Sequence, residues 1–185
     1  MEPKHMEVFE GQRATGNKEK LLSQYNQRWN TDTCDPSEEM LAFAKTKLVL
    51  YKKVCLIKGA VDALELKETY DADTLFLVLH FLIDDGEKVA LIKDTVQRLK
   101  PGGTLLLFDI SDGKKELLDT FVIQNALFQQ HWRPRDIAKR KTRITTQLHA
   151  IPYQRCEELL QEARFTKTVK FHQFTICSAW ITTKT

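Results

Sequence analysis

The sequence predicts an α/β fold with a doubly wound, mostly parallel sheet that ends in an antiparallel hairpin. Short apolar runs bounded by charged or turn residues, which are typical of strands buried on both faces, alternate with segments of helical periodicity. Near the end of the chain, residues 166–171 and 174–182 are two β-rich runs joined so tightly that only an antiparallel hairpin can connect them.

The remaining elements follow from the same two periodicities. Apolar runs predict strands at residues 8–10, 54–57, 73–81 and 104–110. Apolar residues at three- and four-residue spacing predict helices at residues 18–25, 36–48, 87–100, 116–130 and 152–163. Between the third helix and the strand that follows it, Pro101, Gly102 and Gly103 supply a stop and a turn.

The second predicted helix has the clearest start. Asp35 is a capping acid, Pro36 stands at the first helical position, and Glu38 follows the cap by three residues. These signals predict that Asp35 caps the helix.

Composition bounds the class of protein. A chain of 185 residues with 42% hydrophobic content is long enough for one core, so we expect one domain over residues 1–185. The chain has no long apolar run and no signal peptide, which predicts a soluble cytoplasmic protein without membrane contact. The four cysteines lie far apart and form no CxxC pair, so neither a metal site nor a disulfide framework is expected.

Two segments resemble a known family. Residues 78–82 through Leu99-Lys100-Pro101-Gly102-Gly103 are similar to the fourth strand, the following helix and the LKPGG turn of the class I S-adenosylmethionine (SAM) dependent methyltransferases. In the same register, residues 33–41 resemble the end of the family's second strand, whose acidic residue holds the ribose hydroxyls of SAM. The resemblance covers nearly the whole chain from Val8. It implies a seven-stranded type of sheet, SAM as cofactor, and one-carbon transfer to a small molecule or RNA.

The resemblance also implies a set of cofactor-binding residues. In this resemblance Asp35 holds the ribose of SAM. A carboxylate at the carboxyl end of a strand can accept hydrogen bonds from both ribose hydroxyls. The implied cofactor residues are Glu10, Gly16, Asp35, Val61 and Leu77. The family's glycine loop is altered, because Gln12 and Ala14 stand at two glycine positions, and Ala60 replaces an adenine-binding Asp. Arg164 similarly stands where the family has a glycine after the last helix.

Candidate acceptor-side residues lie on the second half of the chain. His80, near the expected methyl position, is a candidate base, and the alternative is a histidine packed in the core. Residues 132–143 hold six Lys/Arg against one Asp, within a segment at about 111–150 where the family often builds a substrate cap. Arg133, Arg135 and Arg140 are candidates for holding phosphate or carboxylate, and the alternative is a solvated charged face.

Two functions therefore remain open at the level of sequence. The first is a SAM-dependent methyltransferase acting on a small molecule or RNA. The second is a non-catalytic, methyltransferase-like binding protein with an impaired SAM site, which the altered glycine loop favours. The first expected strand begins at Val8, whereas family members carry several tens of residues before it, so an open cofactor site is expected. The aromatic residues of the terminal hairpin suggest core or homodimer contacts.

Overall fold

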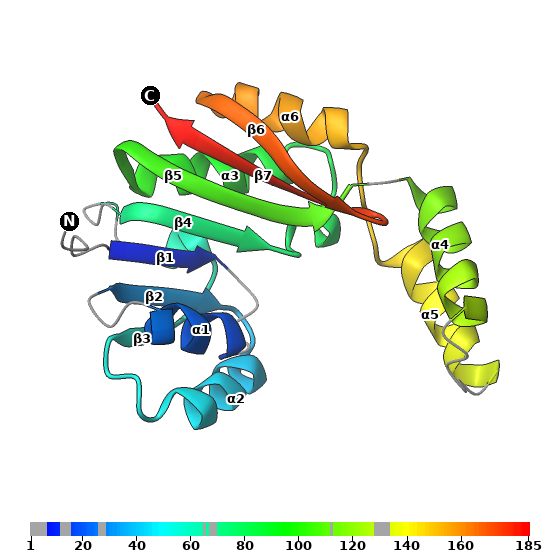
Figure 1. Ribbon diagram of the computed structural model, residues 1–185, viewed down its shortest axis with the longest axis horizontal. Coiled ribbons are helices and arrows are strands. Elements are labelled where there is room, and N and C mark those ends of the chain that lie inside the picture. Colours follow the sequence, from blue (N-terminus) through cyan, green and yellow to red (C-terminus); the bar gives the residue numbers. More distant parts are fainter. Residues whose placement is uncertain are drawn as a thin grey trace.

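The computed structural model describes residues 7–11, 16–25, 29–64, 66, 70–111, 113–127 and 134–185. Seven strands form one sheet in the order β3-β2-β1-β4-β5-β7-β6 (Figure 1). The strands are β1 (Glu7–Gly11), β2 (Asn30–Asp35), β3 (Val54–Lys58), β4 (Tyr70–Phe76), β5 (Leu99–Ile110), β6 (Phe165–Phe174) and β7 (Cys177–Lys184). The helices are α1 (Asn17–Tyr25), α2 (Glu38–Leu48), α3 (Glu87–Arg98), α4 (Lys114–Leu127), α5 (Pro134–Thr146) and α6 (Tyr153–Glu162). The predicted α/β class is confirmed.

The strand order creates a switch point between β1 and β4. Strands β1 to β5 run parallel, so their carboxyl ends meet at one edge of the sheet. At the end of β1, Gly11 pairs with Cys34 of β2 on one side and Leu75 of β4 on the other. Helices α4 and α5 stand beyond this edge, where ligands of open α/β sheets bind (Figure 1).

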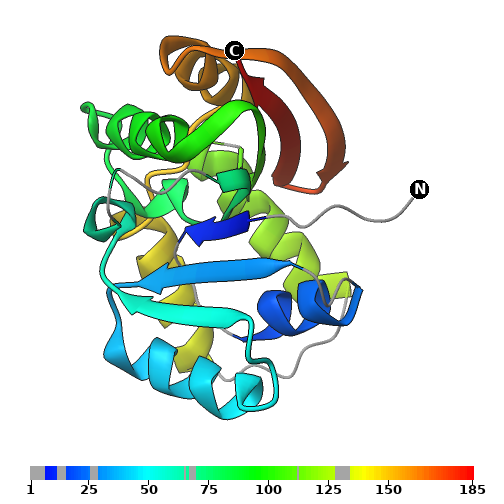
Figure 2. The same cartoon turned by 90° about the vertical axis from the view of Figure 1, so that its left-hand side faces the viewer.

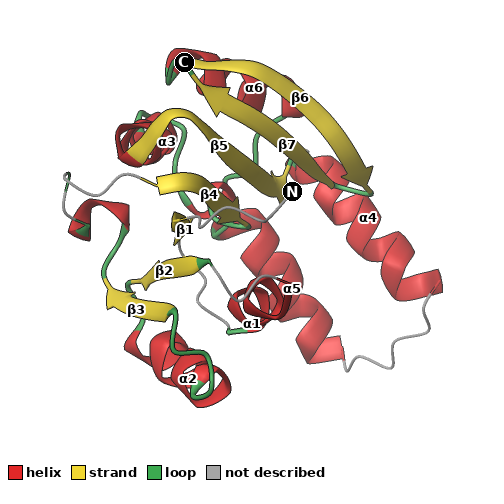
Figure 3. Ribbon diagram, turned by 60° about the vertical axis from the view of Figure 1, so that its left-hand side comes forward, coloured by secondary structure: helices red, strands yellow, loops and turns green. Residues whose placement is uncertain are grey.

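The main core lies in the half of the sheet formed by β4, β5, β7 and β6. Helices α3 and α6 contact each other and pack on this half (Figure 3). Their buried faces meet alternate residues of the strands, as expected for helices covering a pleated sheet. Fully buried members of this core include Leu75, Ile92, Leu105, Leu107, Leu159 and Trp180. Each such side chain stabilises the fold by about 1.5 to 3 kcal/mol relative to exposure.

The half formed by β1, β2 and β3 has a smaller core. Buried Ala44 and Leu48 of α2 form a separate cluster over β3, and α1 contacts α2 beside it (Figure 2). Gly16, at φ 76°, precedes α1, and a Cβ atom there would lie 3.2 Å from the Cα of Ala44 and 3.1 Å from the Cβ of Lys47. A glycine is therefore needed where the start of α1 approaches α2.

Two predicted boundaries at the carboxyl edge are wrong. The fourth strand ends at Phe76 rather than at residue 81, because Leu77 adopts φ 58° and the chain then enters the 3₁₀ turn η2 (Leu79–Phe81). The cap of α2 is Ser37, whose hydroxyl accepts a hydrogen bond from the Met40 amide. Asp35 instead accepts from the Ser37 amide at 2.8 Å, so it shapes the turn two residues before the cap.

The basic segment is helical, which the sequence analysis did not predict. Residues 134–146 form α5, which packs along α4 and carries most of its charges on exposed positions. The terminal hairpin is antiparallel, with Val169 opposite Ile181 and Thr175 at φ 51° in its turn. In the part of the chain that the structure describes, no helix has the length and apolarity needed to cross a membrane.

Candidate functional site

The turn η2 is held from both ends by buried charges. Asp109 of β5 is fully buried, and its Oδ2 accepts hydrogen bonds from the amides of Val78 at 2.8 Å and Leu79 at 2.7 Å. The Nζ of buried Lys88 donates to the carbonyls of Leu79 and Leu82, the latter at 2.7 Å. An anion at the amide end and a cation at the carbonyl end complement the dipole of the turn. Burial lowers the pKa of Lys88, and the nearby Asp109 carboxylate opposes that shift.

His80 is the residue that this turn presents. Its Nδ1 lies 2.6 Å from Oδ1 of Asp109, and the side chain is 4% exposed. With Asp109 as the carboxylate acceptor, Nδ1 carries a proton and Nε2 is the nitrogen that can accept another. The His80 carbonyl also accepts the amide of His149 at 2.7 Å, which ties the segment after α5 to the turn. The arrangement gives an oriented imidazole suited to proton transfer.

A cavity of about 590 Å³ opens beside His80, between η2, the end of β5 and helices α4 and α5. We call it the His80 cavity. Its apolar wall comes from η2, α4, α5 and the segment after α5, and includes Phe81, Phe121, Ile144 and Leu148. The Phe81 ring contacts the His80 ring, with centroids 4.1 Å apart and planes tilted by 45°. The cavity is within the size range of small-molecule sites.

The open side of the His80 cavity is basic. Lys139, Arg140 and Arg143 of α5 line it, and Asp136 is the acidic side chain among its lining residues. The Arg143 guanidinium carbon lies 5.8 Å above the centre of the Phe81 ring, a cation–π distance. The cavity therefore combines an aromatic surface with an excess of positive charge, which suits a planar or apolar molecule bearing an anionic group.

Asp35, the residue predicted to hold the ribose of SAM, lies at the same edge of the sheet but in the half formed by β1, β2 and β3. Asp35 ends β2, is 5% exposed, and its carbonyl accepts the amide of Gly59 from the segment after β3. Its Oδ1 is held by the Ser37 amide at 2.8 Å, so the carboxylate is fixed in orientation. A fixed carboxylate at the end of β2, next to the end of β1, fits the chemistry of a ribose diol.

The other predicted cofactor residues lie on β1, in the turn after β3, directly after β4 and directly before α1. Glu10 lies on β1 between Thr33 and Thr74, while Gln12 and Ala14 of the glycine loop lie outside the described residues. Val61 is 1% exposed and belongs to the main core, so its side chain is not open to a ligand. Leu77 is half-buried, and its amide donates to the Phe108 carbonyl at 2.7 Å. Gly16 contacts α2, as described above.

The three predicted arginines do not act as one group. Arg140 lines the His80 cavity, whereas Arg135 is exposed, lies 3.9 Å from Asp136, and is not part of the cavity wall. Arg133 lies outside the described residues. Sequence reasoning missed Asp109, although an acid within the apolar run 104–110 was an available signal, since a buried carboxylate needs several donors.

Comparison with known proteins agrees with this geometry. A sequence model of the family described as "Methyltransferase domain" matches residues 14–105. The search of curated proteins found no match. The matched segment runs from before α1 into β5 and includes β2, α2, β3, β4 and α3, whereas β1 precedes it.

Solved structures extend the likeness to the whole chain. The carbon methyltransferase of CurJ has 14% sequence identity and a TM-score of 0.71, covering 99% of this chain and 50% of its own. An O-methyltransferase family 2 protein from Planctomyces limnophilus DSM 3776, complexed with apigenin, has 16% identity and a TM-score of 0.68, covering 97% and 50%. The N-methyltransferase NodS from Bradyrhizobium japonicum WM9, complexed with S-adenosyl-L-homocysteine (SAH), has 14% identity and a TM-score of 0.65, covering 96% and 77%.

This chain therefore spans half the length of the first two structures, and the likeness at these identities concerns the fold. The strand order, the match over residues 14–105 and these structures show that the chain has the fold of the class I methyltransferases.

Proposed function

We propose that this chain binds SAM and transfers its methyl group to a small acceptor that carries an anionic group. The observation that carries the proposal is the His80 cavity, in which an oriented histidine, an aromatic wall and three cations meet at the carboxyl edge of the sheet. A methyltransferase structure with the same fold is complexed with the small molecule apigenin, which supports a small acceptor over RNA.

In this proposal, residues at the ends of β1, β2 and β4 would hold the cofactor. Asp35 would hold the ribose hydroxyls, and backbone groups near Gly11, Val61 and Leu77 would contact the remainder. NodS, which shares the fold, is complexed with SAH. When bound, SAM supplies an electrophilic methyl group on its sulfonium.

The chain's own residues would orient the acceptor and take up its proton. An acceptor O–H or N–H loses its proton to Nε2 of His80 while the oxygen or nitrogen gains the methyl group, and Asp109 stabilises the resulting imidazolium. Arg143 and Arg140 would hold the anionic group, with Phe81 against the apolar part. Most of the rate would come from in-line placement of the two reactants.

The test is transfer of labelled methyl from SAM to a panel of phenolic carboxylates and phosphates, each paired with its uncharged amide or alcohol. We expect transfer to the anionic members. His80→Gln should lower kcat by on the order of 10²- to 10⁴-fold, and Arg143→Met should raise KM for anionic acceptors only.

Lys141→Met is the matched control, because Lys141 is exposed on α5 and does not line the cavity. It should leave both constants unchanged. Absence of transfer to any member, from protein that binds SAH, would contradict the acceptor assignment. Absence of both transfer and SAH binding would favour the non-catalytic binding protein.

A further inference from the structure

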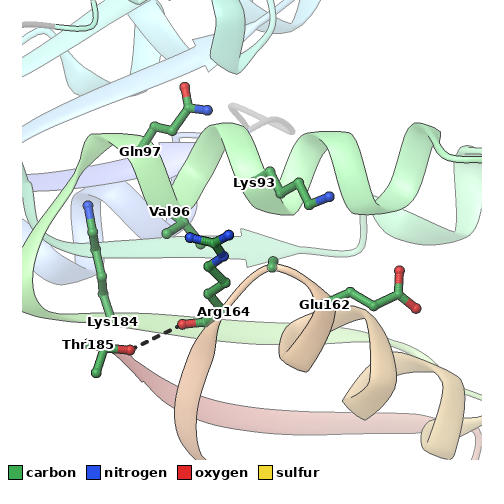
Figure 4. Close-up of a pocket in the computed structure, with 8 residues that line it drawn as sticks. Lys93, Val96, Gln97, Glu162, Arg164, Lys184 and Thr185 are labelled. Atoms are coloured by element: carbon green, nitrogen blue, oxygen red, sulfur yellow. Dashed lines mark hydrogen bonds between the residues drawn. The ribbon is translucent and has the colours of Figure 1, made fainter.

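A second cavity, of about 680 Å³, lies at the opposite edge of the sheet from His80. It is enclosed by α3, the end of α6 and the end of β7, beside the first residue of β5 (Figure 4). We call it the Arg164 cavity. Its wall includes Lys93, Arg164 and Lys184, with Val96 and Ala163 as its apolar members. Because it lies at the amino ends of the parallel strands, it is separate from the site of the proposed methyl transfer.

The positive charge of the Arg164 cavity is not neutralised by its own acid. Among the side chains that line it, the carboxylate is that of Glu162, which is bound by Arg155, whose Nη1 lies 2.6 Å away. Lys184 donates to the Leu99 carbonyl at 2.6 Å, which fixes its ammonium beside the cavity. Within the described ranges, the side chains of Lys93 and Arg164 have no hydrogen-bond or ion-pair partner.

Arg164 occupies a backbone position that favours glycine. It follows α6 and its C-cap Ala163, and has φ 66°. Its amide donates to Gln161, and its carbonyl accepts the Thr185 hydroxyl at 3.3 Å, so the turn is anchored on both sides. A glycine would adopt this left-handed conformation without the steric cost that an arginine bears. In Figure 4 the strained residue projects its guanidinium toward Val96, between Lys93 and Lys184.

We propose that the Arg164 cavity binds the phosphate group of a small phosphorylated molecule. Three cations from three separate parts of the fold line it, and a phosphate offers three charged oxygens where a carboxylate offers two. The planar fork of Arg164 can bind two of these oxygens together. The volume exceeds that of a bare phosphate, and Val96 and Ala163 provide an apolar surface for the organic part of the ligand.

The experiment titrates the full chain with inorganic phosphate, glucose 6-phosphate, glucose and acetate at constant ionic strength. Binding is followed by ³¹P line broadening and by the shift in Tm. Arg164→Gly removes the guanidinium and relieves the positive φ. Lys167→Gly is the matched control, because Lys167 is also a cation at positive φ, 55°, but does not line the cavity.

Both glycine variants should fold with Tm raised by about 2 to 4 °C, since the strain is relieved in each. Only Arg164→Gly should weaken phosphate and glucose 6-phosphate binding, by at least about tenfold. Lys93→Met should also weaken the binding of phosphate and glucose 6-phosphate, without changing the backbone conformation. Neither glucose nor acetate should bind the wild-type chain.

Three results would overturn the proposal. They are equal phosphate binding by the wild type and Arg164→Gly, an equal loss in Lys167→Gly, and acetate binding as tight as phosphate binding. None of these readouts depends on methyl transfer, so they stand apart from the outcome for the proposed function.

Discussion

The two halves of the sheet differ in how firmly their sites are built. Around β4 and β5, the His80 turn is fixed by buried Asp109 and Lys88 over a large apolar core. Around β1 to β3, the core of α2 is a small cluster, and Leu21, Phe43, Val49 and Leu50 of this half are exposed. Among the described residues, the His80 turn is therefore backed directly by the main core, whereas α2 packs on β3 through a small cluster of its own.

This difference in packing predicts which half of the sheet a bound ligand stabilises more. A site supported by many buried contacts needs little ordering when a ligand arrives, whereas a thinly packed region gains stability from the ligand itself. We therefore expect SAH to stabilise the β1–β3 half more than the β4–β6 half. Hydrogen exchange with and without SAH measures this directly, and equal protection of the two halves would contradict the comparison.

The largest effect on stability should come from Asp109→Ala. It removes the acceptor of two buried amides and the partner of His80, and it removes the negative charge that most favours the ionised form of buried Lys88. Breaking a buried pair in this way costs about 3 to 5 kcal/mol of unfolding free energy. Urea denaturation measures it, and a loss below about 1 kcal/mol would show that the turn does not depend on Asp109.

The next largest loss of unfolding free energy should come from Leu→Ala substitutions, which can be made in both cores. Leu159→Ala in α6 should cost about 2 to 5 kcal/mol, because the fully buried site cannot collapse around the deleted atoms. Leu48→Ala in α2 should cost less than about half as much, since that cluster borders exposed Val49 and can relax. Equal losses in urea denaturation would mean that the two halves are packed equally well.

An alkaline-pH effect of intermediate size should come from one thiol. Burial raises the pKa of Cys156 to about 12. Above pH 9 the unfolded thiol ionises while the folded one stays protonated, so folding stability falls with rising pH, by at most about 1.4 kcal/mol per unit, until about pH 12. Cys156→Ala should flatten the decline in unfolding free energy between pH 8 and 10. Cys55→Ala, which changes an exposed thiol, should not flatten it.

The smallest change in unfolding free energy should come from breaking the half-exposed ion pair of Asp71 and Lys100, whose charged atoms are 2.9 Å apart. Asp71→Ala should change the unfolding free energy by at most about 1 kcal/mol, because water screens such pairs. A larger loss would mean that charge as such, rather than burial, explains the effect of Asp109→Ala.

Much of the fold was predictable because it depends on periodicity. The apolar runs and helical repeats predicted the α/β class and the terminal hairpin, and the position of Asp35 predicted its place at the carboxyl edge. These features depend on residues close together in the chain. The predicted cap at Asp35 failed because Asp35 and Ser37, which are two positions apart, can both accept amide hydrogen bonds, and only geometry decides which one caps.

The His80 cavity was predictable only in part. His80 and Arg140 were identified by residue type, but Asp109 pairs with His80 across 29 positions of sequence, which no local pattern reports. The end of β4 was misplaced because the apolar run continues to Leu82 while the backbone turns at Leu77. The replacement of the family's glycine by Arg164 was visible in the sequence. The cations beside it come from α3 and β7, which only the fold brings together.

The most direct test of the account is calorimetric titration of the folded chain with SAH, beside Asp35→Ala and the control Asp62→Ala, which changes an exposed acid near the same edge. The account predicts micromolar binding, about −8 kcal/mol, weakened by about 1 to 3 kcal/mol in Asp35→Ala alone. Absence of heat from the wild type, or equal affinity in Asp35→Ala, would contradict the assignment of the cofactor to the end of β2.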